Sequence, residues 1–195
     1  MTRVAQGRNV TGVSDVSGEQ LATEGESASG ATARHGRARW PLLLSTAALV
    51  LALDQLTKWW AVNVLDLRTI ELVGSLRLRL TINHGSAFSL ADGRGPLISL
   101  LAIVIVVFLL RSGRHATSPA MAITIGMVLG GAIGNLLDRA FRPGDGFLGG
   151  GVVDFIDLQW WPVFNLADSA IVVGAITLFL LQWQDEDKPG AERRT

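Results

Sequence analysis

The stretch VVDFIDLQWWPVFNLADSAIVVGAITLFLLQW, residues 152–183, decides the fold because it joins an aromatic segment to an apolar run of membrane-spanning length. The run at residues 163–183 matches the roughly 20 residues that a helix needs to cross a bilayer. Three aspartates, Asp154, Asp157 and Asp168, stand in or beside this run. Carboxylates at the edge of a bilayer are costly, so at least one of them is expected to have a function.

Three further apolar runs precede this one, at residues 40–60, 96–110 and 119–137. Tryptophans at both ends of the first run are typical of interfacial anchors. The second run is short and rich in β-branched residues, which also suits a buried helix of a soluble protein, but its neighbours favour a crossing. The pattern predicts a mainly α membrane protein, a bundle of four transmembrane helices with both termini on the same side.

The composition agrees with a membrane protein. Hydrophobic residues make up 49% of the 195 residues and charged residues 17%, whereas about a quarter of the residues are charged in soluble domains. The formal net charge of zero gives no indication of nucleic-acid binding. The absence of cysteine excludes disulfides, thiolate metal sites and a cysteine nucleophile. It also excludes a lipoprotein, whose lipid is attached to a cysteine.

Residues 1–39 differ from the rest of the chain, because they are rich in Gly, Ala, Ser and Thr and show no apolar periodicity. Such a segment buries too little surface to offset the entropy of ordering, so a disordered N-terminal tail is predicted. No apolar segment follows Met1 closely enough for a cleavable signal peptide. The predicted membrane domain covers residues 40–184, and residues 185–195 are expected to form a cytoplasmic C-terminal tail.

The distribution of Lys and Arg predicts the orientation. Basic residues precede the first run, fill residues 111–115 and follow the fourth run, so these ends are placed in the cytoplasm. The opposite side carries a similar number of basic residues, so the bias is small. On that side leucine alternates with arginine in LRLRLTIN, residues 76–83, which indicates a strand. A small extracytoplasmic β-sheet is expected, with Arg77 and Arg79 at a solvated or headgroup-facing edge.

Asp154 and Asp168 each have a structural and a catalytic interpretation. If Asn165 caps the fourth helix, Asp168 is its third residue, as in a capping box, and Asp154 is then a solvated loop carboxylate. Alternatively, the two lie together on one side of the membrane among apolar and aromatic neighbours. Burial raises the pKa of a carboxyl, and two like charges cannot both ionise. A proton shared in this way serves peptide hydrolysis in aspartic proteases.

Two groups of polar residues lie at the outer ends of the first and third runs. Asp54 and Lys58 are four residues apart, which favours a helix ion pair that braces the first helix against the outer loop. Asn135, Asp138 and Arg139 occur in GNLLDR, and buried polar groups at that depth need partners. We interpret these three as a clamp between the third and fourth helices that also orients the aspartates.

The pattern also leaves other functions open. A transporter or channel would use intramembrane carboxylates and arginines as an ion relay, but the polar residues gather at one face and no repeat symmetry is visible. A subunit of a membrane assembly would use the glycines at 126, 130 and 134, whose spacing predicts close helix packing. A pair of Lys58 with Ser86 or Ser89 would suit nucleophilic catalysis. The absence of HExxH argues against a zinc peptidase.

Four motifs carry a resemblance to a known family. They are NHGSAFS at residues 83–89, GNLLDR at 134–139, VVDF at 152–155 and FNLADSA at 164–170. Their order, and the place of each relative to an apolar run, resemble those of lipoprotein signal peptidase, also called signal peptidase II. The resemblance covers residues 40–183, nearly all of the chain outside the two tails.

The resemblance implies an aspartic endopeptidase of the bacterial cytoplasmic membrane, with its active site toward the outer face. Its implied partners are membrane lipid and diacylglyceryl-modified prolipoproteins, which it cuts just before the lipidated cysteine. No metal or other cofactor and no nucleic acid are implied, and we expect a monomer.

The resemblance also implies the site. Asp154 and Asp168 are the implied catalytic aspartates, and Asp168 is expected to be ionised at rest because the start of a helix favours negative charge. Asn135, Arg139 and Asn165 are expected to hold the pair by hydrogen bonds. The full set of implied supporting residues is Asp54, Lys58, Asn83, Gly85, Ala87, Phe88, Asn135, Asp138, Arg139, Asn165 and Ala167.

Two segments depart from the family pattern. One is the tail at residues 1–39, and the other is RPGDGFLGGG, residues 142–151, inserted before VVDF. The insertion would disable the site only if it shifted Asp154 out of register. Because surface loops tolerate added length at little cost, the register is expected to survive.

Overall fold

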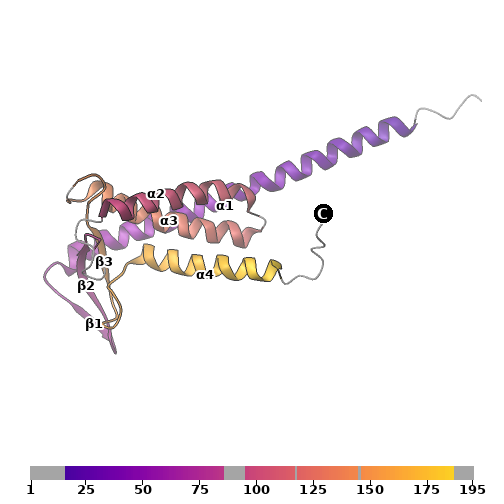
Figure 1. Cartoon of the computed structure of the whole chain (residues 1–195). Coiled ribbons are helices and arrows are strands. Elements are labelled where there is room, and N and C mark those ends of the chain that lie inside the picture. The colour runs from indigo at the N-terminus through magenta and orange to yellow at the C-terminus, as the bar shows by residue number, and fades with distance from the viewer. Residues whose placement is uncertain (1–15, 86–94, 117, 145, 187–195) are drawn as a thin grey trace, which may run out of the picture. The chain divides into compact units, whose positions relative to one another are not determined.

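The computed structural model describes residues 16–85, 95–116, 118–144 and 146–186. Its elements, in chain order, are α1 (Val16–Leu65), β1 (Ile70–Val73), β2 (Leu76–Asn83), α2 (Gly95–Ser112), a 3-10 turn (Gly113–His115), α3 (Pro119–Phe141), β3 (Val152–Asp157) and α4 (Leu166–Glu186). The chain divides into two units, Met1–Arg37 and Ala38–Thr195. The second unit contains the apolar helices and the sheet (Figure 1).

Four helical segments are long and apolar enough to cross a membrane: Arg39–Leu65, Gly95–Ser112, Pro119–Phe141 and Leu166–Gln184. They confirm the predicted crossings, with small shifts at the ends. The fourth helix begins at Leu166 instead of residue 163, because the side chain of Asn165 accepts a hydrogen bond from its first turn and caps it.

The first helix extends beyond the predicted boundary at residue 39. Helix α1 begins at Val16, so residues 16–39, part of the predicted disordered tail, continue the helix. Low apolar content argues against a packed core, whereas the Glu, Gln and Ala residues of this segment have high intrinsic helix propensity. Residues 1–15 and 187–195 lie outside the described part of the chain, so the tails predicted there stay predictions.

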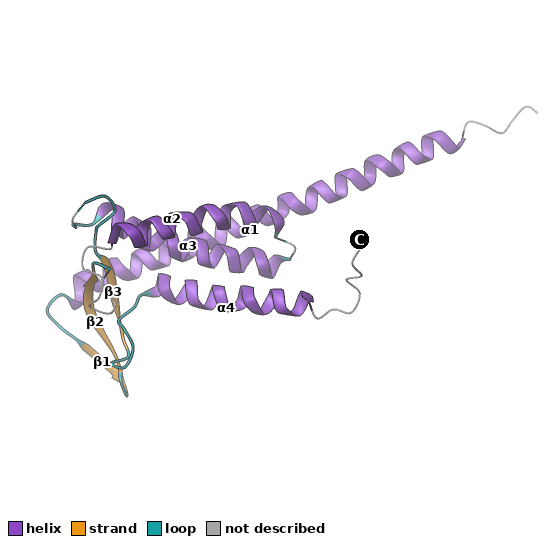
Figure 2. Ribbon diagram, in the orientation of Figure 1, coloured by secondary structure: helices purple, strands orange, loops and turns teal. Residues whose placement is uncertain are grey.

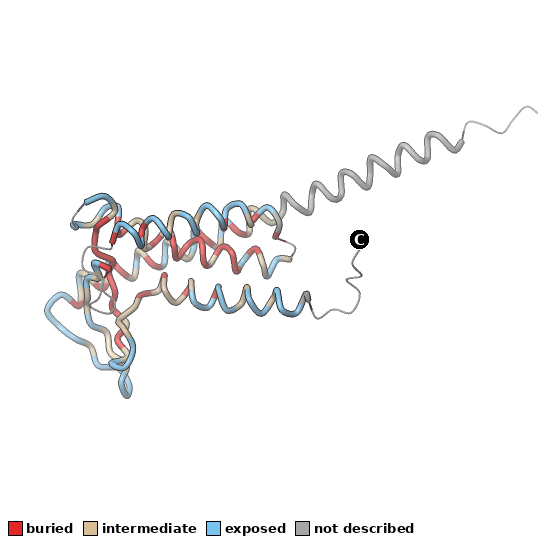
Figure 3. Tube along the Cα trace, viewed as in Figure 1, coloured by how far each residue is buried: buried red, intermediate tan, exposed pale blue. Residues whose placement is uncertain are grey.

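Helix α3 is the most buried helix of the bundle (Figure 3). In the 18-residue apolar stretch of α3, 56% of the residues are buried, against 17% in the corresponding stretch of each of the other three spans. Its glycines let α1 approach closely: a Cβ atom at Gly126 would lie 2.6 Å from the Leu43 carbonyl oxygen. One at Gly130 would lie 2.5 Å from the Ala47 carbonyl oxygen. The close helix packing predicted from the glycine spacing is therefore confirmed.

Replacing Gly130 by alanine is expected to lower the free energy of unfolding by about 1–3 kcal/mol, because the added methyl group overpacks the contact between α3 and α1. Thermal unfolding of the purified protein in detergent measures the effect. Ile123→Leu is the control on the same helix, because Ile123 is 39% exposed and the change keeps its volume. Equal melting temperatures for Gly130→Ala and the wild type would contradict this account.

The three strands form an antiparallel sheet in the order β1-β2-β3 at one end of the bundle (Figure 2). Strand β2 has the bounds predicted from the leucine–arginine alternation. The sequence pattern does not predict β3, because Asp154 and Asp157 interrupt its apolar residues. Val153 and Phe155 of β3 belong to one apolar cluster with Leu65 of α1, which fixes the sheet against the end of that helix.

Arg77 and Arg79 differ in part from their predicted setting. Arg77 Nη2 lies 2.9 Å and Arg79 Nε 3.1 Å from Oδ2 of Asp157 on β3, although Arg79 is still 47% exposed. Burial favours the neutral form of Asp157, but hydrogen bonds from Gln159 and Arg77 and the two arginine charges outweigh it and hold its pKa below the ordinary value. One aspartate of the opening stretch thus has structural partners.

Candidate active site

Strand β3 places Asp154 beside the helix bundle, where the residue is 2% exposed. Its Oδ2 accepts a hydrogen bond of 3.0 Å from Asn83 Nδ2, and its Oδ1 accepts one of 2.7 Å from Asn165 Nδ2. Asp154 is therefore a buried strand residue held by two amides. The alternative of a solvated loop carboxylate is wrong, because β3 pairs with β2 and carries Asp154 inward.

Asp168 lies in the first turn of α4 and caps that helix. Its Oδ2 accepts a hydrogen bond of 3.2 Å from the Asn165 backbone N–H, and Asn165 Oδ1 accepts one of 2.9 Å from the Asp168 backbone N–H. This reciprocal pair is the predicted capping-box arrangement. The other oxygen, Oδ1, accepts a hydrogen bond of 2.8 Å from Asn135 Nδ2.

Asn165 connects the two aspartates. It is fully buried, its side-chain amide donates to Asp154, and its backbone N–H donates to Asp168. The same Nδ2 atom lies 3.1 Å from Asn135 Oδ1, and Asn135 in turn donates to Asp168. Asn135 on α3 and Asn165 at the cap of α4 therefore join the carboxyl groups of Asp154 and Asp168 in one hydrogen-bond network.

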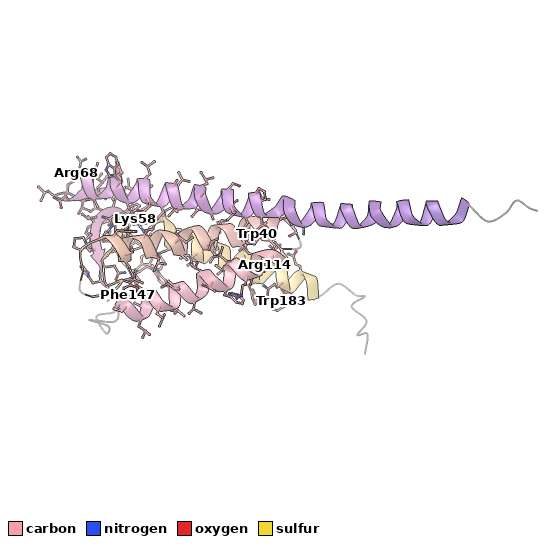
Figure 4. The ribbon with its side chains drawn as sticks, turned by 90° about the horizontal axis from the view of Figure 1, so that it is seen from above. Trp40, Lys58, Arg68, Arg114, Phe147 and Trp183 are labelled. Atoms are coloured by element: carbon pink, nitrogen blue, oxygen red, sulfur yellow. The ribbon has the colours of Figure 1, made fainter. Side chains whose placement is uncertain are left out.

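Lys58 of α1 is buried at the sheet end of the bundle (Figure 4). Its ammonium group lies 2.9 Å from Asp54 Oδ2, 3.0 Å from Asp138 Oδ2 and 2.8 Å from Asn135 Oδ1. An ammonium has three N–H groups, so all three find acceptors. The Asp54–Lys58 pair, predicted to brace the first helix, thus joins α1 to α3. The charged ammonium has no lone pair to act as the base of a Ser–Lys pair.

The two carboxylates bound to Lys58 reach further elements. Asp54 Oδ1 accepts a hydrogen bond of 3.0 Å from the Ala167 backbone N–H in the first turn of α4. Asp138 Oδ2 accepts one of 3.2 Å from the Val153 backbone N–H of β3, and its Oδ1 lies 2.8 Å from Arg142 Nε. The network therefore fixes the backbone directly before Asp154 and directly before Asp168.

Arg139 does not bind the aspartates as predicted. Among the residues that the structure describes, its guanidinium has one hydrogen-bond acceptor, the Gly150 carbonyl oxygen, 3.3 Å from Nη1. The prediction placed Arg139 on the correct helix face, but the inserted segment supplies a carbonyl acceptor that the motif does not reveal. Arg139 instead lines the cavity that both aspartates share.

This cavity has a volume of about 340 Å³ and combines polar and apolar walls. Its apolar walls come from α2, α3 and α4, and include Ile105, Val128 and Ile171. Its polar lining is formed by Asn83, Asn135, Arg139, Asp154 and Asp168. An apolar cavity with a few convergent polar groups is typical of an active site that binds a largely apolar ligand.

Gly85 also lines the cavity and requires the absence of a side chain. Its φ of +104° lies in the region that favours glycine, and a Cβ atom would lie 3.2 Å from the Gly95 nitrogen. Asn83 Oδ1 accepts a hydrogen bond of 2.9 Å from the Gly85 N–H, which forms the predicted turn. Ser86, Ala87, Phe88 and Ser89 lie outside the described residues.

Comparison with known proteins assigns the chain to a family. A family model described as "Signal peptidase (SPase) II" matches residues 46–184. The chain belongs to the signal peptidase II family. The protein named "Lipoprotein signal peptidase" of Rhodococcus jostii (strain RHA1) is 50% identical over 142 residues, 72% of this chain and 71% of that protein. The protein of the same name from Mycobacterium avium (strain 104) is 46% identical over 160 residues, 80% of this chain and 87% of that protein.

Solved structures show the same fold. A bacterial membrane enzyme determined at 2.3 Å resolution by the in meso method superimposes with a TM-score of 0.66, at 24% identity over 78% of this chain and 94% of that one. A second, at 1.9 Å, gives a TM-score of 0.62 at 26% identity, over 73% and 93% of the two chains. The predicted multi-pass membrane peptidase of the signal peptidase II family, four helices with a small sheet, is confirmed.

In this member of the family, burial is the main cause that raises the pKa of Asp154 to about 6. That value is the net result of burial and the charge of Asp168, which raise the pKa, and of hydrogen bonds from Asn83 and Asn165 and the charge of Lys58, which lower it. Asp154 therefore keeps its proton to a higher pH than an ordinary aspartate.

One contact at the site is not visible in the sequence. Ser99 and Leu148 form a contact beside the cavity, and no motif or periodicity singles out either residue.

Within the described ranges no cluster of three or more His, Asp or Glu residues is arranged to hold a metal ion.

Proposed function

We propose that this chain removes the signal peptide from diacylglyceryl-modified prolipoproteins, cutting just before the lipidated cysteine, with Asp154 and Asp168 as the catalytic pair. The observation that carries the proposal is that two carboxyls, joined through Asn165, line one largely apolar cavity at the sheet end of a membrane bundle. A substrate that combines a signal-peptide helix with two acyl chains fits a site walled by apolar helix faces.

The environments of the two carboxyls support different roles. Asp168 accepts two N–H donors and sits at the positive end of the α4 dipole, which favours the ionised form. Asp154 is buried and has the raised pKa, which favours the protonated form. In the proposed mechanism the two carboxyls therefore share one proton, which Asp154 holds at the start of the reaction.

The reaction follows from these roles. The Asp168 carboxylate takes a proton from a water molecule as its oxygen attacks the scissile carbonyl carbon, and Asp154 gives its proton to the carbonyl oxygen. The tetrahedral intermediate then collapses: the carbon–nitrogen bond breaks, the leaving amine of the lipidated cysteine receives the proton that Asp168 holds, and a hydroxyl group of the intermediate returns a proton to Asp154 as the new carboxyl group forms. Arg139 and Asn83 line the cavity and donate to carbonyl groups of the bound peptide.

The orientation belongs to the same proposal. Lys58 and Phe147 lie at the sheet end of the bundle, whereas Trp40, Arg114 and Trp183 lie at the opposite end (Figure 4). Tryptophan and arginine at that end suit a cytoplasmic interface. The sheet and the aspartates then face the outer side of the bacterial cytoplasmic membrane, and both termini are cytoplasmic.

Cleavage of a purified prolipoprotein, with and without the diacylglyceryl group, tests the function. We expect the protein in detergent to cut the modified substrate before the cysteine and to leave the unmodified one intact. The control substrate carries serine in place of the lipidated cysteine. Cleavage of both forms at equal rates, or of neither by the folded protein, would overturn the proposal.

The pH dependence tests the proton assignment. Because Asp154 must be protonated to act as the acid, kcat/KM is expected to fall above pH about 6. The amide of Asn83 favours the ionised form of Asp154, so Asn83→Ala raises its pKa and moves the midpoint of the fall to higher pH. Asn63→Ala, which removes an amide bonded to the Trp59 carbonyl oxygen, is the control. A downward shift in Asn83→Ala would contradict the assignment.

A further inference from the structure

Ser99 links helix α2 to the inserted segment that precedes β3. It is fully buried, and its hydroxyl oxygen lies 3.0 Å from the Gly95 carbonyl oxygen and 2.9 Å from the Leu148 carbonyl oxygen. Its single hydrogen is therefore shared between a carbonyl of its own helix and one that is 49 residues away. Residues 146–151 are called the strap here, because they cross from the end of α3 to the start of α2.

The strap has a defined backbone. Leu148 has a φ of 54°, which is uncommon for a residue other than glycine and costs about 1 kcal/mol, so surrounding contacts must hold it. Gly144 and Gly150 form an antiparallel bridge, and the Gly151 N–H donates to the Pro143 carbonyl oxygen at 3.2 Å. The contact between Leu148 and Ser99 is thus part of a closed turn.

The strap forms hydrogen bonds with both the backbone and the side chain of Arg139. Gly150 N–H donates to the Arg139 carbonyl oxygen at 3.1 Å, and the Gly150 carbonyl oxygen accepts from Arg139 Nη1 at 3.3 Å. The start of α2 packs on the same guanidinium, since a Cβ atom at Gly95 would lie 3.4 Å from Nη1. The strap, the first turn of α2 and the Arg139 side chain therefore form one packed unit at the cavity.

We propose that the strap positions Arg139 and the α2 wall of the substrate cavity, and that Ser99 is the positioning residue that fastens it. Ile98 and Leu101, on either side of Ser99 in the chain, line the cavity, so a change in the position of α2 changes its width. This inference rests on the proposed function, because it assigns the insertion a part in binding the same prolipoprotein. It concerns substrate binding and leaves the proton chemistry of the aspartates unchanged.

Ser99→Ala is the first test, with the diacylglyceryl-modified prolipoprotein as substrate. Loss of one neutral hydrogen bond is expected to raise KM by about threefold to tenfold. The value of kcat is expected to stay within about twofold, because the wall and Arg139 contact substrate and transition state alike. Ser45→Ala is the matched control, because the Ser45 hydroxyl is exposed and bonds only to the Leu42 carbonyl oxygen among the described residues. An unchanged KM, or a fall in kcat alone, would overturn the proposal.

Hydrogen–deuterium exchange provides a readout that does not depend on cleavage. Amide exchange in residues 146–151 is expected to be at least about tenfold faster in Ser99→Ala than in the wild type or Ser45→Ala. If exchange is unchanged, the strap proposal fails even where the wild type cleaves its substrate. If the wild type does not cleave but exchange responds, the proposed function fails and the fastening role of Ser99 stands.

A second variant tests the strap without altering α2. A Cβ atom at Gly150 would lie 2.6 Å from the Arg142 carbonyl oxygen and 2.8 Å from those of Arg139 and Asp138, so Gly150→Ala displaces the strap. The expected result is again a raised KM with nearly constant kcat. Ser45→Ala, which alters an exposed hydroxyl of α1, is again the control, and its KM is expected to equal that of the wild type. The opposite ranking of these two variants would overturn the proposal.

Discussion

Asp154→Asn and Asp168→Asn are each expected to reduce the rate of prolipoprotein cleavage by about 10²–10⁴-fold, the usual contribution of a general acid or base. Asparagine keeps one oxygen, which still accepts the hydrogen bond from Asn165 or Asn135, and gives up only the second hydrogen bond of the carboxylate, so the fold is expected to be retained. It neither gives nor takes a proton at neutral pH. Initial rates on the diacylglyceryl-modified substrate measure the effect, and melting temperatures within a few degrees of the wild type confirm the fold.

The third aspartate of the opening stretch supplies the control for this experiment. Asp157 lies on the same strand as Asp154 but binds Arg77 and Arg79 away from the cavity, so Asp157→Asn is expected to keep at least about half of the activity. If Asp154 and Asp168 act as a unit, the double variant loses little more than either single variant. Substantial activity in Asp154→Asn or Asp168→Asn would refute the proposed pair.

Lys58→Met is expected to lower the free energy of unfolding by about 3–5 kcal/mol, because it leaves buried carboxylates without their cation. Lys58 has no exposed surface, and it is the group that Asp54, Asp138 and Asn135 share. Methionine has a similar length and an apolar end, so the loss measures the charge more than the packing. Thermal or chemical unfolding in detergent, followed by tryptophan fluorescence, gives the value.

A variant that also removes the charges of Asp54 and Asp138 provides the control. In the triple variant Lys58→Met, Asp54→Asn and Asp138→Asn, the amide oxygens can still accept from the Ala167 and Val153 N–H groups. This variant is expected to recover at least half of the stability that Lys58→Met loses, because replacing all members of a buried ionic group is far less costly than breaking it. A triple variant less stable than Lys58→Met would show that the charges are not the cause.

Local patterns in the sequence predicted the elements whose causes are local. Apolar length gave the four spans, the leucine–arginine alternation gave β2, and the spacing of Asn165 and Asp168 gave the cap of α4. The resemblance placed both aspartates, whose shared cavity the structure then describes.

The spacing of residues along the sequence did not predict contacts between residues that are far apart in the chain. The helix spacing of Asp54 and Lys58 revealed their pair, but not that the same ammonium binds Asp138 from another helix. Strand β3 forms because β2 lies beside it, so its own residues carry only part of the signal. The Arg139 guanidinium donates to the Gly150 carbonyl oxygen of the insertion, and helix or strand periodicity does not predict the position of that carbonyl.

The contact of Asp54 with the start of α4 has a consequence for the biogenesis of the enzyme. The first span enters the bilayer with a lysine and an aspartate whose partners on later helices, Asn135, Asp138 and the Ala167 N–H, are synthesised afterwards. Until the third and fourth spans are made, that pair lacks its partners on α3 and α4, and Asp168 has not yet been synthesised. If Asp154 and Asp168 are the catalytic pair that we propose, the nascent chain cannot cleave a substrate before its last helix is in place.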